Sequence, residues 1–429
     1  MASCAPFTVN ETEGERGWSS KFPPPGATGR CGRHMWPATD ATDGRGEFEM
    51  NAVEEIRQYV RSRGLEACCL DFPGSIELAI DEEELELIRS GHGEFWDEEK
   101  VTEVLGCRPG SFRGGMFHAG GGKVSPLVLR DALLQDAIDR GARLLSSCVV
   151  ERIEEKDDRV VLHTCMKTIE VEKVIVCSNA WIPQILSEYE SIIRPTCDVV
   201  LMTRPLPPAW KFGFTAGDDQ WYGMQMQDGR IFLGGASREC ECLSLESERN
   251  VNEDASRQLR DFMSKFPFLS ESDIEAEWTG LIAETPDLRP VVGAVPGRKR
   301  VWVCGGFSGH GMPVSCSLAR ETAEMALRGE RRSDKKYVSC LDAARFHRSQ
   351  NKLPPLHDPG RGEEEEEARE DAREEELEED IDQLFRELGE KRGVALMDAL
   401  KPRIEAPLPP LQPAVRGLCE MHQEGTKQG

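Results

Sequence analysis

The chain has 429 residues and a formal net charge of −24, with 77 acidic against 53 basic side chains. This length allows one large core or two packed domains followed by a tail. No basic stripe is present to neutralise phosphates, so we expect no nucleic-acid partner. No apolar run suits a membrane span or a signal peptide, so we expect no membrane association and a cytoplasmic location.

Fifteen cysteines are scattered along the chain without any C-x-x-C pair. The spacing typical of a metal site is therefore absent, and we expect no metal. An odd number of cysteines without a secretory signal favours reduced, mostly buried thiols.

The N-terminal part begins with a polar segment, residues 1–25, that contains three consecutive prolines and is predicted to be a disordered leader. Apolar residues at helical spacing predict a helix over 47–63. Alternation predicts a strand over 74–80, and the acidic run that follows predicts a helix ending at Gly91.

The middle of the chain alternates helices and strands. Residues 127–142 predict a helix, and 143–155 with 159–164 predict a β-hairpin. Residues 171–186 read as a strand, a turn and a helix. The strand, around Val174 to Val176, is nearly all apolar, which is typical of a parallel sheet buried on both faces.

Three strands are predicted between residues 193 and 235, in a more antiparallel sheet. A helix is predicted over 252–266, and a strand, a loop and a second strand over 275–297.

Residues 301–328 predict a buried strand, a glycine-crowded turn and an amphipathic helix. Gly305, Gly306, Gly309 and Gly311 let backbone approach a flat ligand, and a helix N-terminus favours negative charge. The order is G-x-x-G-x-G, which differs from the dinucleotide fingerprint G-x-G-x-x-G. Two interpretations therefore stay open: a ligand site, and a generic strand-to-helix turn.

The C-terminal segment 348–429 is predicted to be an acidic tail, partly helical or disordered. Residues 363–429 carry 20 acidic and nine basic side chains, and thus 11 of the 24 net negative charges. Apolar residues recur at helical spacing between Leu377 and Leu388. A solvated acidic tail is the main interpretation, and a helix that docks on a protein partner is the alternative.

Six segments in chain order resemble the D-amino-acid oxidase-like family of FAD-dependent oxidoreductases, which includes glycine, sarcosine and γ-glutamylputrescine oxidases. The resemblance covers about residues 26–347. The segments are GATGRCGRHMWP, VSPLVLRDALLQDAIDRGARLLSSCVVERI, VEKVIVCSNAWIPQIL, DGRIFLGGA, TPDLRPVVGAVPG and VWVCGGFSGHGM.

The resemblance implies a mixed α/β fold with two domains. The first is an incomplete Rossmann-like FAD-binding domain, and the second is an inserted, mainly antiparallel β substrate domain. The FAD-binding domain would comprise 26–80, 120–190 and 285–347. The substrate domain would comprise 81–119 and 191–284.

The resemblance also implies which residues bind FAD. Thr28, Gly29, Arg30, Cys31 and Gly32 would line the flavin, although Cys31 and Arg33 stand where relatives often carry Asn and Gly. The segment LIAETPDLRP has no counterpart of the cysteine that attaches flavin in some relatives, so FAD would be noncovalent.

Further cofactor contacts are implied along the chain. Val149 or Val150 would meet adenine through backbone, and Asn179, Ala180 and Trp181 would approach the cofactor. The isoalloxazine would be covered by Gly306, Gly309, His310, Gly311 and Met312.

The implied reaction oxidises a small amine or amino acid to an imine by hydride transfer to flavin. The catalytic residues stay unknown, and the candidates are His310, Arg238 and Tyr222, with Trp221 nearby. A packed role for His310 and a surface role for Arg238 stay open.

Relatives normally open with a strand, G-x-G-x-x-G and a helix, which we do not find in this sequence. Two interpretations stay open. The sequence is an incomplete version of an active oxidase, or the chain is a non-catalytic family member that acts as a binding or interaction protein.

Overall fold

A computed structural model of the chain describes residues 26–38, 44–146, 148–236 and 251–348. The chain divides into two units, Met1–Leu353 and Pro354–Gly429, and all described residues belong to the first. The predicted leader, the candidate Arg238 and the predicted tail beyond residue 348 lie outside the described residues.

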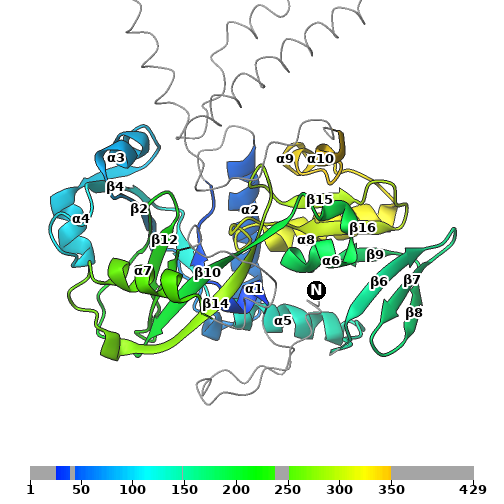
Figure 1. Cartoon of the computed structure of the whole chain (residues 1–429), viewed down its shortest axis with the longest axis horizontal. Coiled ribbons are helices and arrows are strands. Elements are labelled where there is room, and N and C mark those ends of the chain that lie inside the picture. Colours follow the sequence, from blue (N-terminus) through cyan, green and yellow to red (C-terminus); the bar gives the residue numbers. More distant parts are fainter. Residues whose placement is uncertain (1–25, 39–43, 147, 237–250, 349–429) are drawn as a thin grey trace, which may run out of the picture. The chain divides into compact units, whose positions relative to one another are not determined.

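The largest sheet has eight strands: β2 Ser75–Ala79, β3 Glu94–Asp97, β4 Gly114–His118, β10 Arg194–Thr203, β11 Gly213–Ala216, β12 Trp221–Gln225, β13 Ile231–Gly235 and β14 Ile274–Glu284. Their order is β14-β10-β13-β12-β11-β2-β4-β3 (Figure 1). Neighbouring strands are antiparallel except for β11 and β2. The prediction of a mainly antiparallel sheet is confirmed.

One face of this sheet is apolar and lies under helix α7, Glu253–Met263. Side chains alternate between the two faces of a strand, so Trp221 and Phe214 share this face. The Trp221 ring stacks on Phe262 of α7 with centroids 4.9 Å apart, and Phe266 lies 5.5 Å from Phe214.

The opposite face carries polar side chains and is termed the polar face. Tyr222 pairs across strands with Thr215, and Thr215 pairs with Glu77, so these three side chains share one face. The polar side chains on this face include Ser75, Glu77, His118, Asp198, Thr215 and Tyr222.

A second sheet contains β9 Val174–Val176, β15 Val291–Ala294 and β16 Val301–Gly305 in the order β15-β16-β9. Strand β16 is buried at every position and runs parallel to β9. A turn leads from β16 into helix α8, Ser315–Arg328, which ends where Gly329 adopts a left-handed conformation. The predicted strand, turn and helix are confirmed.

A third sheet contains β6 Val150–Glu155, β7 Val160–Thr164 and β8 Thr168–Val171, all antiparallel. The predicted hairpin is confirmed as β6 and β7, whereas β8 and β11 were not predicted. Two short strands, β1 His34–Met35 and β5 Gly122–Lys123, pair separately.

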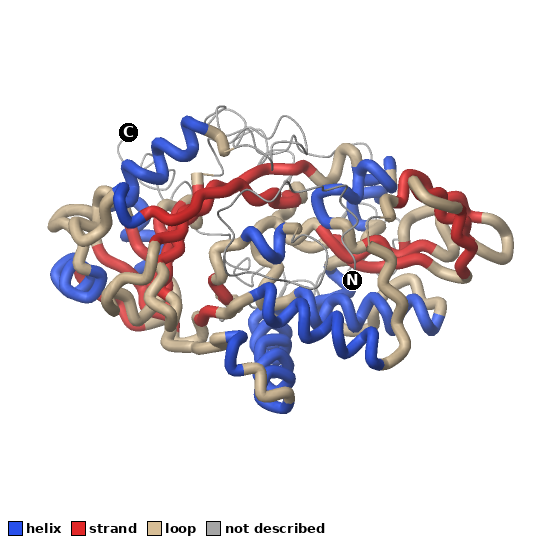
Figure 2. Tube along the Cα trace, turned by 90° about the horizontal axis from the view of Figure 1, so that it is seen from below, coloured by secondary structure: helices blue, strands red, loops and turns tan. Residues whose placement is uncertain are grey.

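Helices α7 and α8 pack on these sheets, and α2, Arg45–Ser62, packs on α8. Figure 2 shows the helices in blue and the strands in red. The apolar stripe of α2 is buried at Val53, Ile56 and Val60, as its spacing predicts. The remaining bounds are α1 Ala27–Arg30, α3 Glu82–Arg89, α4 Glu98–Leu105, α5 Pro126–Asp139, α6 Ile182–Ile185, α9 Lys336–Cys340 and α10 Arg345–Arg348.

Strand β2 lies within the predicted FAD-binding segment 26–80, and it is hydrogen-bonded to β11 and β4 of the eight-stranded sheet. The division of the chain into domains stays a prediction.

The prediction of reduced thiols is wrong for Cys197, which is disulfide-bonded. Within the described part of the chain, no helix is long and apolar enough to cross a membrane. The same residues contain no cluster of His, Cys, Asp and Glu that could hold a metal ion.

The aromatic cluster under α7 predicts a stability difference between two phenylalanines. Phe266 is 0% exposed and Phe268 is 37% exposed. Phe266→Ala should lower the free energy of unfolding by about 3–5 kcal/mol because it leaves a cavity. Phe268→Ala should cost less than half as much. Urea denaturation of both variants checks this, and equal costs would contradict the packing.

Candidate functional site

Residues 30–36 lie across the polar face. The chain enters this segment through α1, which contains Thr28, Gly29 and Arg30. Trp278 Nε1 of β14 donates a hydrogen bond of 2.8 Å to the Arg30 carbonyl.

The crossing continues over β2 and β4. His34 Nε2 lies 2.7 Å from Ser75 Oγ of β2, and the Trp36 ring packs 5.2 Å from the ring of His118 on β4. Burial, with a contribution from the charge of His310, lowers the pKa of His34 to about 3. His34 is therefore neutral at physiological pH.

Tyr222 is wedged between two glycines, one on this segment and one on the sheet. A Cβ at Gly32 would lie 2.0 Å from the Tyr222 ring, and a Cβ at Gly234 would lie 2.2 Å from it. The absence of a side chain at Gly32 is therefore required by the Tyr222 ring.

The candidate Tyr222 is hydrogen-bonded to Asp198. Removal from water raises the pKa of Asp198 to about 7, although its hydrogen bond to Tyr222 opposes this shift. Trp221 points to the apolar face instead, so the structure does not bring its side chain near Asp198.

Arg33 occupies a conformation that glycine adopts more readily. Its φ is +68°, and its guanidinium lies 4.3 Å from the Phe232 ring centroid and 3.4 Å from Ser125 Oγ. Burial lowers the pKa of Arg33 to about 10, so it stays charged at neutral pH. Cys31, two residues earlier, is half-buried, and its thiol lies 3.5 Å from the Thr28 carbonyl.

Asn179 joins the turn after β16 to the turn after β9. Its side-chain oxygen accepts a hydrogen bond of 3.0 Å from the Gly306 N–H, and its φ is +47°. A Cβ at Gly305 would lie 2.3 Å from Ile182 Cδ1, so only glycine permits this approach. The structure thus brings two of the predicted cofactor segments together.

Ala180 and Trp181 support this junction from the core. They are 2% and 7% exposed and belong to the main apolar cluster. Met312 packs against a different cluster, which contains Val53 of α2.

Gly309 lies in the open part of the turn. Its φ is +79°, and a Cβ there would meet no described atom within 4 Å. The backbone at Gly309 is therefore open to the approach of a ligand.

His310 is held by a carboxylate that no sequence motif indicated. Its Nε2 lies 2.7 Å from Glu49 Oε2 on α2, and Glu49 also accepts from Arg45 Nε at 2.6 Å. A buried acid on a predicted apolar helix face could have signalled this role, because an unpaired charge is rarely buried.

The two residues predicted to meet adenine have backbone partners within the chain. Val149 N–H donates to Cys165 Sγ at 3.3 Å, and Val149 C=O accepts from Cys165 N–H at 3.0 Å. Val150 pairs with Thr164 across the β6 and β7 hairpin.

Four thiols in the predicted cofactor segments and the elements next to them have shifted pKa values. Burial raises the pKa of Cys31 in the loop, Cys177 after β9, Cys304 in β16 and Cys316 in α8.

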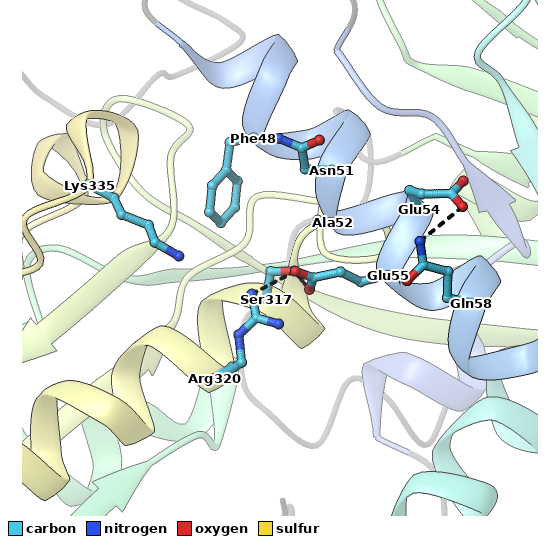
Figure 3. Close-up of a pocket in the computed structure, with 9 residues that line it drawn as sticks. All are labelled: Phe48, Asn51, Ala52, Glu54, Glu55, Gln58, Ser317, Arg320 and Lys335. Atoms are coloured by element: carbon cyan, nitrogen blue, oxygen red, sulfur yellow. Dashed lines mark hydrogen bonds and ion pairs between the residues drawn. The ribbon is translucent and has the colours of Figure 1, made fainter. Parts of the chain in front are cut away.

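A pocket of about 410 Å³ lies between α2 and α8 (Figure 3). Glu55 accepts hydrogen bonds of 2.7 Å from Ser317 and from Arg320, so the charges of Glu55 and Arg320 are paired. It contains none of the predicted cofactor residues. Its lining is Phe48, Asn51, Ala52, Glu54, Glu55, Gln58, Ser317, Arg320 and Lys335.

The Asn179 junction gives a testable pair of variants. Asn179→Ala should lower the free energy of unfolding by about 2 kcal/mol, because it loses a hydrogen bond and keeps a strained φ. Asn179→Gly should cost about 1 kcal/mol less, because glycine relieves the strain. Chemical denaturation measures both, and a Gly variant no more stable than the Ala variant would refute this account.

His34 predicts a pH dependence of stability. Between its usual pKa of 6.5 and its folded pKa of about 3, only the unfolded chain protonates it. Stability should therefore fall as pH falls through this window, by at most about 1.4 kcal/mol per pH unit. His34→Gln should lack this part of the pH dependence of stability. Denaturation measured over this pH range checks it, and an equal fall in stability of the two proteins would rule out the contribution of His34.

Comparisons with known proteins agree with this arrangement. Residues 19–325 match the model of the DAO family, described as FAD dependent oxidoreductase. The chain is 27% identical over 243 residues to the probable oxidoreductase OrdL of Rhizobium meliloti, covering 55% of this chain and 54% of that protein. It is 26% identical over 232 residues to the monomeric sarcosine oxidase of Streptomyces avermitilis, covering 50% and 59%.

Solved structures show the same fold. Glycine oxidase from Geobacillus kaustophilus matches with a TM-score of 0.65 at 20% identity, covering 75% of this chain and 89% of that one. L-proline dehydrogenase from P. horikoshii matches with 0.63 at 21%, covering 75% and 88%. The chain spans little more than half the length of the curated relatives above. Because the family match covers most of the chain, this protein belongs to the DAO family of FAD-dependent oxidoreductases.

Proposed function

We propose that the protein oxidises the C–N bond of an amino acid or another small amine to an imine, with noncovalent FAD as the hydride acceptor. The family supports the cofactor, and relatives named for sarcosine and N-methyl-L-tryptophan support an amine substrate. The observation that carries the proposal is the open glycine turn at Gly309, between a buried strand and the start of α8.

The residues of this turn fit the ring end of FAD. Gly309 leaves space for a flat group, and Asn179 fixes the turn through Gly306. The N-terminus of α8 follows the turn and favours negative charge close to it. When bound, the flavin would accept a hydride from the carbon next to the substrate nitrogen.

The segment 28–32 and Trp181 are proposed to complete the flavin site. Substrate would lie toward the polar face, where Tyr222 is the proposed contact. The proposed role of Arg238, which would bind a carboxylate, rests on the sequence alone.

One observation favours the alternative, a family member that does not bind FAD. The Val149 backbone groups proposed to meet adenine are hydrogen-bonded to Cys165. Adenine binding there would require these bonds to open. Such a chain would act as a binding or interaction protein, for which the acidic tail is the proposed contact.

Two matched glycine variants test the proposal. Gly309 and Gly329 have φ of +79° and +74°, and at either position an added Cβ would meet no described atom within 4 Å. Gly309→Ala and Gly329→Ala should therefore each lower stability by about 1 kcal/mol. Only Gly309→Ala should weaken FAD binding, by about tenfold or more, because its methyl group enters the ligand space.

The measurement is the visible spectrum of the purified full-length protein during titration with FAD. Wild type and Gly329→Ala should bind FAD with equal affinity. A wild-type protein that stays colourless would reject the proposal in favour of the alternative. Equal binding by all three proteins would show that FAD does not lie over Gly309.

A further inference from the structure

The carboxylate of Glu49 is a fully buried group with three hydrogen-bond donors. Its side chain is 0% exposed. Oε1 accepts from Arg45 Nε at 2.6 Å, and Oε2 accepts from Ala38 N–H at 2.6 Å and from His310 Nε2 at 2.7 Å. A buried carboxylate with this many donors is satisfied in its charged form.

The charge state of Glu49 determines which nitrogen of His310 carries a proton. Burial on its own would raise the pKa of Glu49, but hydrogen bonding and charge from His310 and Arg45 outweigh it, so the pKa is lowered. An ionised carboxylate can only accept hydrogen bonds. His310 Nε2 must therefore bear a hydrogen.

The second nitrogen of His310 remains available. Nδ1 forms no hydrogen bond with any residue that the structure describes, and the side chain is 26% exposed. In the neutral tautomer with hydrogen on Nε2, Nδ1 has a lone pair that accepts a hydrogen bond. Nδ1 can therefore accept a hydrogen bond from an N–H or O–H group of a ligand.

His310 also lies close to the polar face. In its protonated form His310 contributes to the low pKa of His34, which contacts Ser75 on that face, so the two histidines lie near each other. A ligand bound between the glycine turn and the polar face would thus meet the His310 ring.

We propose that Glu49 is a positioning residue that fixes His310 in the Nε2–H form, so that Nδ1 accepts a hydrogen bond from the ammonium or amine group of the substrate. The identity of this donor rests on the proposed function, whereas the tautomer does not. The pair links α2 to the turn across 261 positions of sequence.

The tautomer can be measured by NMR of the full-length protein with 15N-labelled histidine. His310→Gln assigns the His310 signal among the eight histidines. In the wild type, the neutral His310 tautomer with hydrogen on Nε2 should be about tenfold more populated than the tautomer with hydrogen on Nδ1. Glu49→Gln should reduce this excess severalfold, because an amide can donate as well as accept.

Glu55→Gln is the matched control. Glu55 lies on the same helix and accepts hydrogen bonds from Ser317 and Arg320 of α8, not from His310. This variant should leave the His310 tautomer unchanged. If His310 in the wild type carries its hydrogen mainly on Nδ1, the proposal is overturned, and this result does not depend on the folding of any variant. An unchanged tautomer in folded Glu49→Gln would also overturn it.

The donor is tested with two cations that differ in N–H groups. Methylammonium should shift the Nδ1 signal of His310, and tetramethylammonium, which lacks N–H, should not. Equal responses to both, or none, would overturn the assignment of an amine donor. Failure to bind FAD in the spectral titration would reject the proposed function and leave the tautomer result intact.

Discussion

The crossing of residues 30–36 over the polar face is the contact on which the rest of the site depends. It brings the backbone of residues 30–36 against a sheet whose strands are far away in sequence. Tyr222 fits only because positions 32 and 234 lack side chains. A sheet with one apolar face under α7 can expose polar groups on the other, because side chains alternate along each strand.

The glycine turn depends on a second set of close approaches. Asn179 binds Gly306, Ile182 lies where a side chain of residue 305 would be, and Glu49 holds His310. These groups come from three separate parts of the chain. Because contacts from several sides hold the turn in place, the backbone at Gly309 can stay accessible.

Much of the fold follows from local sequence pattern. The apolar stripe of α2 and the strand, turn and helix at 301–328 could be predicted because their spacing matches the period of the element. Strand β11 could not, because its four residues are all buried and do not alternate. Strand β8 does alternate, but it has only four residues, which are too few for a firm prediction. The place of β2 depends on its pairing with β4 and β11, which its own five residues do not encode.

The candidate site could be predicted only in part. Glycines and Asn179 stand in motifs that the resemblance covers, whereas Glu49 lies within a helix that reads as an ordinary amphipathic one. Its role becomes visible only when the chain brings it to His310. The left-handed backbone of Arg33 fits the resemblance in another way, because relatives often place glycine there and this chain keeps the conformation without it.

The raised pKa values of four thiols have a consequence for the chemical durability of the protein. Peroxide attacks thiolates far faster than thiols. Cys31, Cys177, Cys304 and Cys316 have raised pKa values because burial disfavours their charged forms. They therefore stay protonated at neutral pH and behave as small apolar side chains that react slowly with oxidants.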